Sequence, residues 1–129
     1  MLNDPLAAGL SKIMNAERVG KREVALKPVS KMMKQVLEIM NEHHYVGSYE
    51  ETQDGQAGLL KINLLGNINK CGVIKPRFSA PYRAFEKWEK RYLPAKDFGI
   101  LVVSTPLGVM THIQAKEKKM GGKLLAFCY

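Results

Sequence analysis

The sequence is poor in cysteine and in long apolar runs, and these scarcities exclude several classes of protein. Two cysteines, Cys71 and Cys128, occur among 129 residues, far apart and without a CxxC pair. They could form one disulfide, but two free thiols that pack as small apolar groups in a reducing compartment are favoured. No apolar run reaches about 18 residues, so we expect no transmembrane helix and no membrane partner. The opening MLNDPLAAGL has an acidic residue and a proline instead of basic residues, so we expect no signal peptide.

The sequence also lacks the motifs of common phosphate-binding and hydrolytic enzymes. GxxxxGK[ST], GxGxxG and GxSxG are all absent. A nucleophilic Ser104 or Thr105 would need His112 and a buried acid beside it. The nearest acids, Asp97 and Glu117, lie in polar sequence. We therefore expect no enzyme and no catalytic residue, and a small phosphate-binding enzyme that uses the Ser-Thr loop and His112 is the alternative.

No set of histidines and cysteines has the spacing of a metal site. The three histidines, His43, His44 and His112, and the two cysteines form no recognisable ligand pattern, so neither a metal nor a cofactor is expected. We interpret His43 and His44 as the end of a helix, where an imidazolium favours the C-terminal dipole.

Charge of one sign is in excess. Lys and Arg number 20 against 12 Asp and Glu, which gives a net charge of +8 and favours a polyanionic partner. The basic residues are spread along the chain, so a basic surface would have to be assembled by folding. A nonspecific basic RNA-binding protein is a second alternative on this ground.

The hydrophobic pattern predicts an α-β-α-β-β order in the first half of the chain. Asp4 and Pro5 are typical of a helix start, and apolar residues then recur at helical spacing until Gly20. Ser30 is expected to cap a second helix with a methionine-rich core stripe. The expected elements are a helix from Pro5 to Arg18, a strand at 23–27, a helix from Ser30 with core positions 32, 33, 36, 37 and 40, and a hairpin of strands 45–53 and 59–65.

The second half is predicted to be mostly β with one or two short helices. The stretch Gly66 to Pro81 is rich in Gly, Asn and Pro, so a boundary is expected within it, between subdomains 1–66 and 67–129 of an α/β (α+β) fold. Thr111 and Gln114 form a capping-box pattern, and Gly121-Gly122 would suit a left-handed helix end. The expected elements are a helix that places Phe85, Trp88 and Tyr92 in the core and ends at Pro94, a strand at 100–103, a helix from Thr111, and a strand at 123–128.

The stretch STPLGVMTHIQAKEKKMGG combines small hydroxyls, glycines and lysines, which suits RNA. Duplex RNA exposes 2′-hydroxyls and shallow base edges to short hydroxyls, and glycines let backbone come close. Lysines add a sequence-independent attraction to phosphate. The hydroxyls are Ser104, Thr105 and Thr111, the glycines are Gly108, Gly121 and Gly122, and the lysines are Lys116, Lys118, Lys119 and Lys123.

STPLGVMTHIQAKEKKMGGKLLAFCY resembles the C-terminal signature of the small-subunit ribosomal protein eight family. NDPLA, NAERVGK, KPVSK and HHYVG are similar to its N-terminal blocks in order. NINKCGVIKPRF and FEKWEKRYLPAKDFG resemble its archaeal and eukaryotic branch. The resemblance runs from about residue 2 to the C-terminus.

The resemblance implies a non-enzymatic, cytoplasmic protein of the small ribosomal subunit with two small α/β subdomains. It would be a monomer when free, would bind the rRNA central domain directly and early in assembly, and would adjoin other ribosomal proteins. A serine common in the family is replaced by Pro106, so no hydrogen bond to RNA is expected there. Asp4 and Ser30 could equally be helix caps. The RNA-binding residues implied or expected are Ser104, Thr105, Gly108, Thr111, Lys118, Gly121, Gly122 and Lys123, with Asn3, Asp4, Ser30 and Lys31 on a second stretch of RNA.

Overall fold

A computed structural model describes residues 5–26, 31–54, 57–75, 77–95 and 98–129. The chain folds into two compact units, residues 1–70 and 71–129, and each unit has its own antiparallel sheet, which confirms the α+β fold class. The elements are α1 (Pro5–Val19), β1 (Glu23–Leu26), α2 (Lys31–Glu42), β2 (Val46–Asp54), β3 (Ala57–Leu64), β4 (Cys71–Val73), β5 (Ser79–Ala80), the 3-10 helix η1 (Tyr82–Ala84), α3 (Phe85–Tyr92), β6 (Ile100–Thr105), β7 (Gly108–Thr111), α4 (His112–Glu117) and β8 (Gly122–Cys128).

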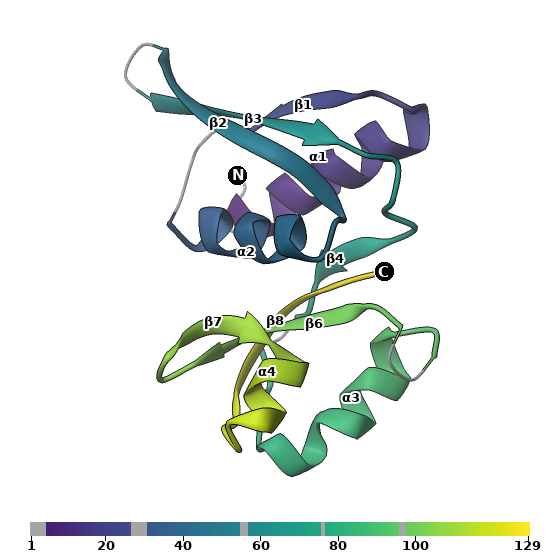
Figure 1. Cartoon of the computed structure of the whole chain (residues 1–129), viewed down its shortest axis with the longest axis vertical. Coiled ribbons are helices and arrows are strands. Elements are labelled where there is room, and N and C mark those ends of the chain that lie inside the picture. The colour runs from purple at the N-terminus through teal and green to yellow at the C-terminus, as the bar shows by residue number, and fades with distance from the viewer. Residues whose placement is uncertain (1–4, 27–30, 55–56, 76, 96–97) are drawn as a thin grey trace. The chain divides into compact units, whose positions relative to one another are not determined.

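The first unit places α1 and α2 on one face of a three-stranded sheet in the order β1-β3-β2 (Figure 1). The apolar stripe of α2 is buried as its spacing predicts, except that Met32 is only half-buried. The two helices and the sheet enclose one core, whose fully buried large side chains are Leu6, Leu10, Ile13, Met33, Leu37, Met40, Leu60 and Ile62.

The second unit is built on a sheet with the order β4-β8-β6-β7, and β5 also pairs with β8. Phe85 is fully buried and Trp88 is nearly so, while Tyr92 is half-buried against them. These aromatic residues therefore belong to the core, as their helical spacing predicts. The rest of the core is Ile74, Ala80, Leu93, Leu101, Val103, Met110, Ala115 and Leu124.

Helices α1, α2 and α4 end in the same way, with one left-handed residue whose own N–H and the N–H of the next residue bond back to carbonyl groups of the last turn. Gly20 takes this position after α1, as its place in the sequence predicts. After α2 it is His44, at φ 62°, and after α4 it is Lys119, at φ 54°. Neither Gly121 nor Gly122 has a positive φ, so the prediction that they form the left-handed end of α4 is wrong.

The two cysteines face each other across the sheet, because Cys71 of β4 is the direct partner of Cys128 of β8. Both are free thiols and both are buried, as expected for small apolar groups. In the part of the chain that the structure describes, no helix is both long enough and apolar enough to span a bilayer.

Candidate nucleic-acid interface

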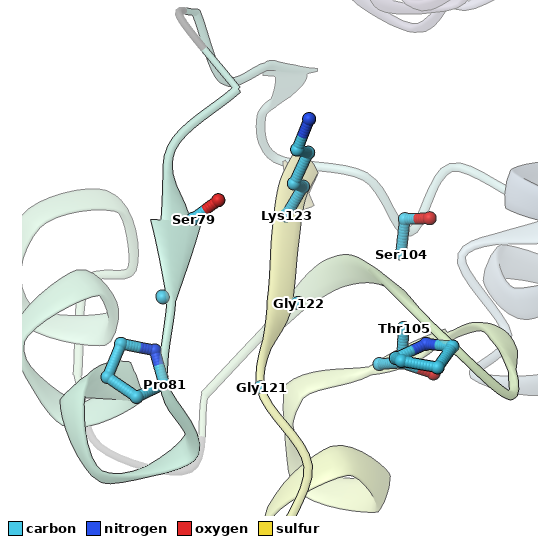
Figure 2. Close-up of a pocket in the computed structure, with 9 residues that line it drawn as sticks. Ser79, Pro81, Ser104, Thr105, Gly121, Gly122 and Lys123 are labelled. Atoms are coloured by element: carbon cyan, nitrogen blue, oxygen red, sulfur yellow. The ribbon is translucent and has the colours of Figure 1, made fainter.

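A shallow hollow of about 470 Å³ opens where β5, β6 and β8 lie side by side in the second unit. Figure 2 shows Gly121 and the start of β8, with Gly122 and Lys123, between Ser79 and Pro81 on one side and Ser104 and Thr105 on the other. Five residues expected to bind RNA therefore line one site. The full lining is Ser79, Ala80, Pro81, Ser104, Thr105, Pro106, Gly121, Gly122 and Lys123.

Three polar residues form a row across the sheet at this hollow. Lys123 of β8 pairs with Ser79 of β5 on one side and with Ser104 of β6 on the other. Directly paired residues point to the same face of a sheet, and neighbouring strands lie about 4.8 Å apart. The row thus presents hydroxyl, ammonium and hydroxyl in sequence. Ser79 and Lys123 are exposed, and neither serine hydroxyl has a hydrogen-bond partner among the described residues.

Gly121 and Gly122 form the floor of the hollow because neighbouring strands come too close for any side chain. A Cβ on Gly121 would lie 2.6 Å from the Ala80 carbonyl oxygen. A Cβ on Gly122 would overlap the Ser104 carbonyl oxygen and lie 2.8 Å from Val103 Cγ1. The two glycines therefore serve close backbone packing, which replaces the cap role predicted from sequence.

Thr105 and Gly108 build the turn at the end of β6. The Thr105 hydroxyl donates to the Gly108 carbonyl oxygen at 2.8 Å and accepts from the Leu107 N–H at 3.3 Å. Its side chain is buried, and its only hydroxyl proton is used inside the turn. Gly108 has φ 128°, which disfavours residues that have a Cβ. Thr105 thus shapes the rim on which Ser104 sits.

Thr111 is the N-cap of α4, as the sequence pattern predicts. Its hydroxyl accepts from the Gln114 N–H at 3.2 Å, and the Gln114 side chain accepts from the Thr111 N–H at 3.1 Å. Thr111 is 1% exposed, so its hydroxyl is committed to the capping box.

His112 belongs to a buried polar cluster and does not line the hollow. The Leu101 N–H donates to His112 Nδ1 at 3.1 Å, which makes Nδ1 an acceptor and the ring neutral. Nε2–H then faces Glu89 Oε1 at 3.0 Å, and Lys116 bonds the same carboxylate. Because both ring nitrogens are engaged, the geometry provides no base for Ser104 or Thr105. Among the described residues, no group of three His, Cys, Asp or Glu could hold a metal ion.

The remaining predicted residues lie outside the hollow. Lys118 is exposed at the end of α4, and Lys31 is exposed at the start of α2 in the first unit. Asn3, Asp4 and Ser30 lie outside the described residues.

Sequence reasoning missed Ser79, the third member of the polar row. Ser79 lies in the segment FSAP, at the end of the stretch Gly66 to Pro81. The Gly, Asn and Pro content of that stretch predicts a connection between subdomains and not part of a binding site. The sequence pattern that would predict a strand here is weak, because β5 has only two residues. Only the pairing with β8 shows that this serine faces Ser104 across Lys123.

Comparison with known families gives one match that spans nearly the whole chain. Residues 4–129 match the model of the family described as ribosomal protein S8. Members of this family are structural, non-enzymatic proteins of the small ribosomal subunit, for which rRNA binding is typical. The two-unit α+β fold and this match agree with the family resemblance of the C-terminal and N-terminal blocks. The chain belongs to the ribosomal protein S8 family.

Proposed function

We propose that this chain binds the central domain of small-subunit rRNA directly through the hollow between β5, β6 and β8, and that this binding helps the subunit assemble. The row Ser79–Lys123–Ser104 carries the proposal. Its two free hydroxyls can exchange hydrogen bonds with 2′-hydroxyls and base edges, and its ammonium can meet phosphate. Gly121 and Gly122 allow the backbone of β8 to pack closely against β5 and β6, which brings the three members of the row side by side.

The residues of the loop divide into contacts and supports under this proposal. Ser104, Lys123 and the backbone of Gly121 and Gly122 are the contacts, and Ser79 joins them. Thr105, Gly108 and Thr111 hold the rim and α4 in place, because their polar groups or backbone are committed to local structure. The exposed Lys118 adds attraction to phosphate.

The first unit contributes a second, weaker contact in this proposal. Lys31, which the structure describes, would make this contact, and so would Asn3, Asp4 and Ser30, which lie outside the described residues.

We further propose that the protein is a cytoplasmic monomer when free and belongs to the archaeal and eukaryotic branch. NINKCGVIKPRF and FEKWEKRYLPAKDFG support this branch by their resemblance.

A substitution at Ser104 tests the hollow as the RNA site. The parent chain is first matched to a cognate fragment from a set tiled across small-subunit rRNA. Ser104→Ala then leaves an RNA polar group unpaired, so binding of that fragment should weaken by about 1–3 kcal/mol, which is roughly 5-fold to 150-fold in Kd. Affinity is measured over a salt series, with circular dichroism to verify the fold.

Ser11→Ala is the matched control, because Ser11 is an exposed serine of α1 outside the site. It should leave Kd unchanged. Random duplex RNA separates specific binding from bulk charge, since Ser104→Ala should hardly affect it. Equal affinity of the parent for cognate and random RNA would favour the nonspecific basic binder. An unchanged cognate Kd for Ser104→Ala would overturn the hollow as the site.

A further inference from the structure

The outer face of α3 carries a row of cations that the hollow does not include. Arg83 of η1 and Lys87, Lys90 and Arg91 of α3 are spaced i, i+4, i+7 and i+8, which places them on one side of a helix. All four are exposed, and with Glu86 they line a second surface depression of about 660 Å³.

In the part of the chain that the structure describes, little negative charge offsets these four cations. None of the four cations has an ion pair among the described residues, and Glu86 is the only acid in the lining. Glu89, the other acid of α3, points inward to His112 and Lys116 and is buried. The outer face of α3 therefore carries four positive charges and one negative charge.

Arg91 is held in place by stacking. Its guanidinium carbon lies 5.5 Å from the centre of the Trp88 ring, 5.8 Å from Tyr92 and 5.9 Å from Phe78. Phe78 and Trp88 are themselves stacked, with ring centres 4.7 Å apart. An aromatic platform orients a guanidinium while its N–H groups stay free for an acceptor. Lys87 lies over the same Trp88 ring at 5.6 Å.

The chain joins this face directly to the hollow. Pro81, which lines the hollow, is the N-cap of η1, and Arg83 of η1 lines the depression on α3. A ligand that follows the surface from Ser79 past Pro81 thus reaches Arg83 and then the α3 cations.

We propose that the outer face of α3 is a second RNA-binding surface, which holds the phosphate backbone beyond the segment bound in the hollow. This inference rests on the proposed function. RNA fits better than an acidic protein segment, because all five lining residues are charged and protein interfaces are depleted of Lys and Glu at their centres. Phosphate groups bind Lys and Arg side chains without any apolar contact. The Arg91 guanidinium can also donate two parallel hydrogen bonds to one phosphate.

The test removes two cations from α3 and compares the result with an equal loss of charge elsewhere. Lys87→Gln with Lys90→Gln is the test pair, and Lys12→Gln with Lys61→Gln, exposed residues of the first unit, is the control pair. Only the test pair should raise the Kd for the cognate fragment, by roughly tenfold near physiological salt. It should also lower the slope of log K against log salt by about 1.4–1.8.

Arg91→Lys tests the stacked fork at constant charge. It should weaken cognate binding by about threefold or more and change the salt slope little, since Lys keeps the charge but loses the planar contact. Hydroxyl-radical footprints should show that the test pair loses protection over a stretch that Ser104→Ala leaves protected.

Each other outcome overturns the inference in a recognisable way. Equal effects of the two pairs would mean bulk charge only. If the double variant Lys87→Gln with Lys90→Gln bound the cognate fragment as tightly as the unchanged chain does, the α3 surface would be refuted and the proposed function would stand. If that test pair also failed to enter small-subunit particles, the partner would be a protein. If the parent bound no rRNA fragment, the inference would fall with the proposed function.

Discussion

At the scale of single residues, Gly122 is the position on which the shape of the hollow most depends. A Cβ there would overlap the Ser104 carbonyl oxygen and crowd Val103, and neither backbone nor buried core can move without disturbing the sheet. We therefore expect Gly122→Ala to lower the free energy of unfolding of the second unit by about 1–3 kcal/mol. Urea denaturation followed by Trp88 fluorescence measures this, because Trp88 is the only tryptophan and lies in that unit.

Gly72→Ala provides the comparison, since Gly72 lies in β4, which pairs with β8, the strand of Gly122. Its added Cβ would meet only the Phe127 ring, at 3.3 Å, and a partly exposed ring can shift. The loss should stay below about 1 kcal/mol. Similar losses at both glycines would mean that close approach at Gly122 does not limit packing.

The residue scale also shows which part of the site could be predicted from sequence. The types of residue predicted a shared location, since five of the residues expected to bind RNA line the hollow; their contact with RNA stays a prediction. Their roles could not be predicted, because a hydroxyl in a turn and a hydroxyl facing solvent look alike in sequence. Ser104 and Thr105 are neighbours, yet only the Thr105 hydroxyl is engaged in hydrogen bonds within the turn.

At the scale of elements, α4 ends in a strained way that a substitution can relieve. Lys119 has φ 54°, a left-handed conformation that costs a residue with a Cβ about 1–2 kcal/mol, more than glycine costs through its freer unfolded chain. Its N–H and that of Met120 bond back to Lys116 and Ala115, so the structure depends on this conformation. Lys119→Gly should therefore raise the free energy of unfolding by roughly 0.5–1 kcal/mol without RNA. Urea denaturation with Trp88 fluorescence checks this value.

Lys118→Gly removes the same charge one residue earlier and is the matched control. Lys118 has φ −86°, where glycine relieves no strain and only adds flexibility to the unfolded chain. It should leave stability unchanged or lower it. A gain at both positions would trace the effect to lost positive charge instead of backbone conformation.

Elements were predictable where their own periodicity defines them. The core stripe of α2 and the core positions of α3 follow from helical spacing, and both are buried. The cations on the outer face of α3 also recur at helical spacing, in the segment RAFEKWEKRY. The two-residue β5 had no such signal, because its pairing with β8 is a long-range contact.

At the scale of the whole molecule, the positive charge is unevenly divided between the two units. Residues 1–70 carry 9 Lys and Arg against 8 Asp and Glu, whereas residues 71–129 carry 11 against 4. Basic residues occur in both units, but the second unit has half as many acids, so the net charge of +8 lies almost entirely in the second unit. Electrostatic attraction to RNA should concentrate on this unit, which also contains the hollow and the α3 face.

This asymmetry predicts that one lysine of the second unit contributes more to RNA affinity than one of the first. Lys123→Gln removes the ammonium between two hydroxyls of the hollow, and Lys31→Gln removes an exposed cation at the start of α2. The two variants lose the same charge, so bulk electrostatics cannot distinguish them. We expect Lys123→Gln to raise the Kd for the cognate fragment by roughly fivefold near physiological salt and Lys31→Gln by about twofold or less. Binding of the full-length variants over one salt series provides the measurement. A larger loss for Lys31→Gln would assign the main contact to the first unit, against the division of labour that the charge and the hollow favour.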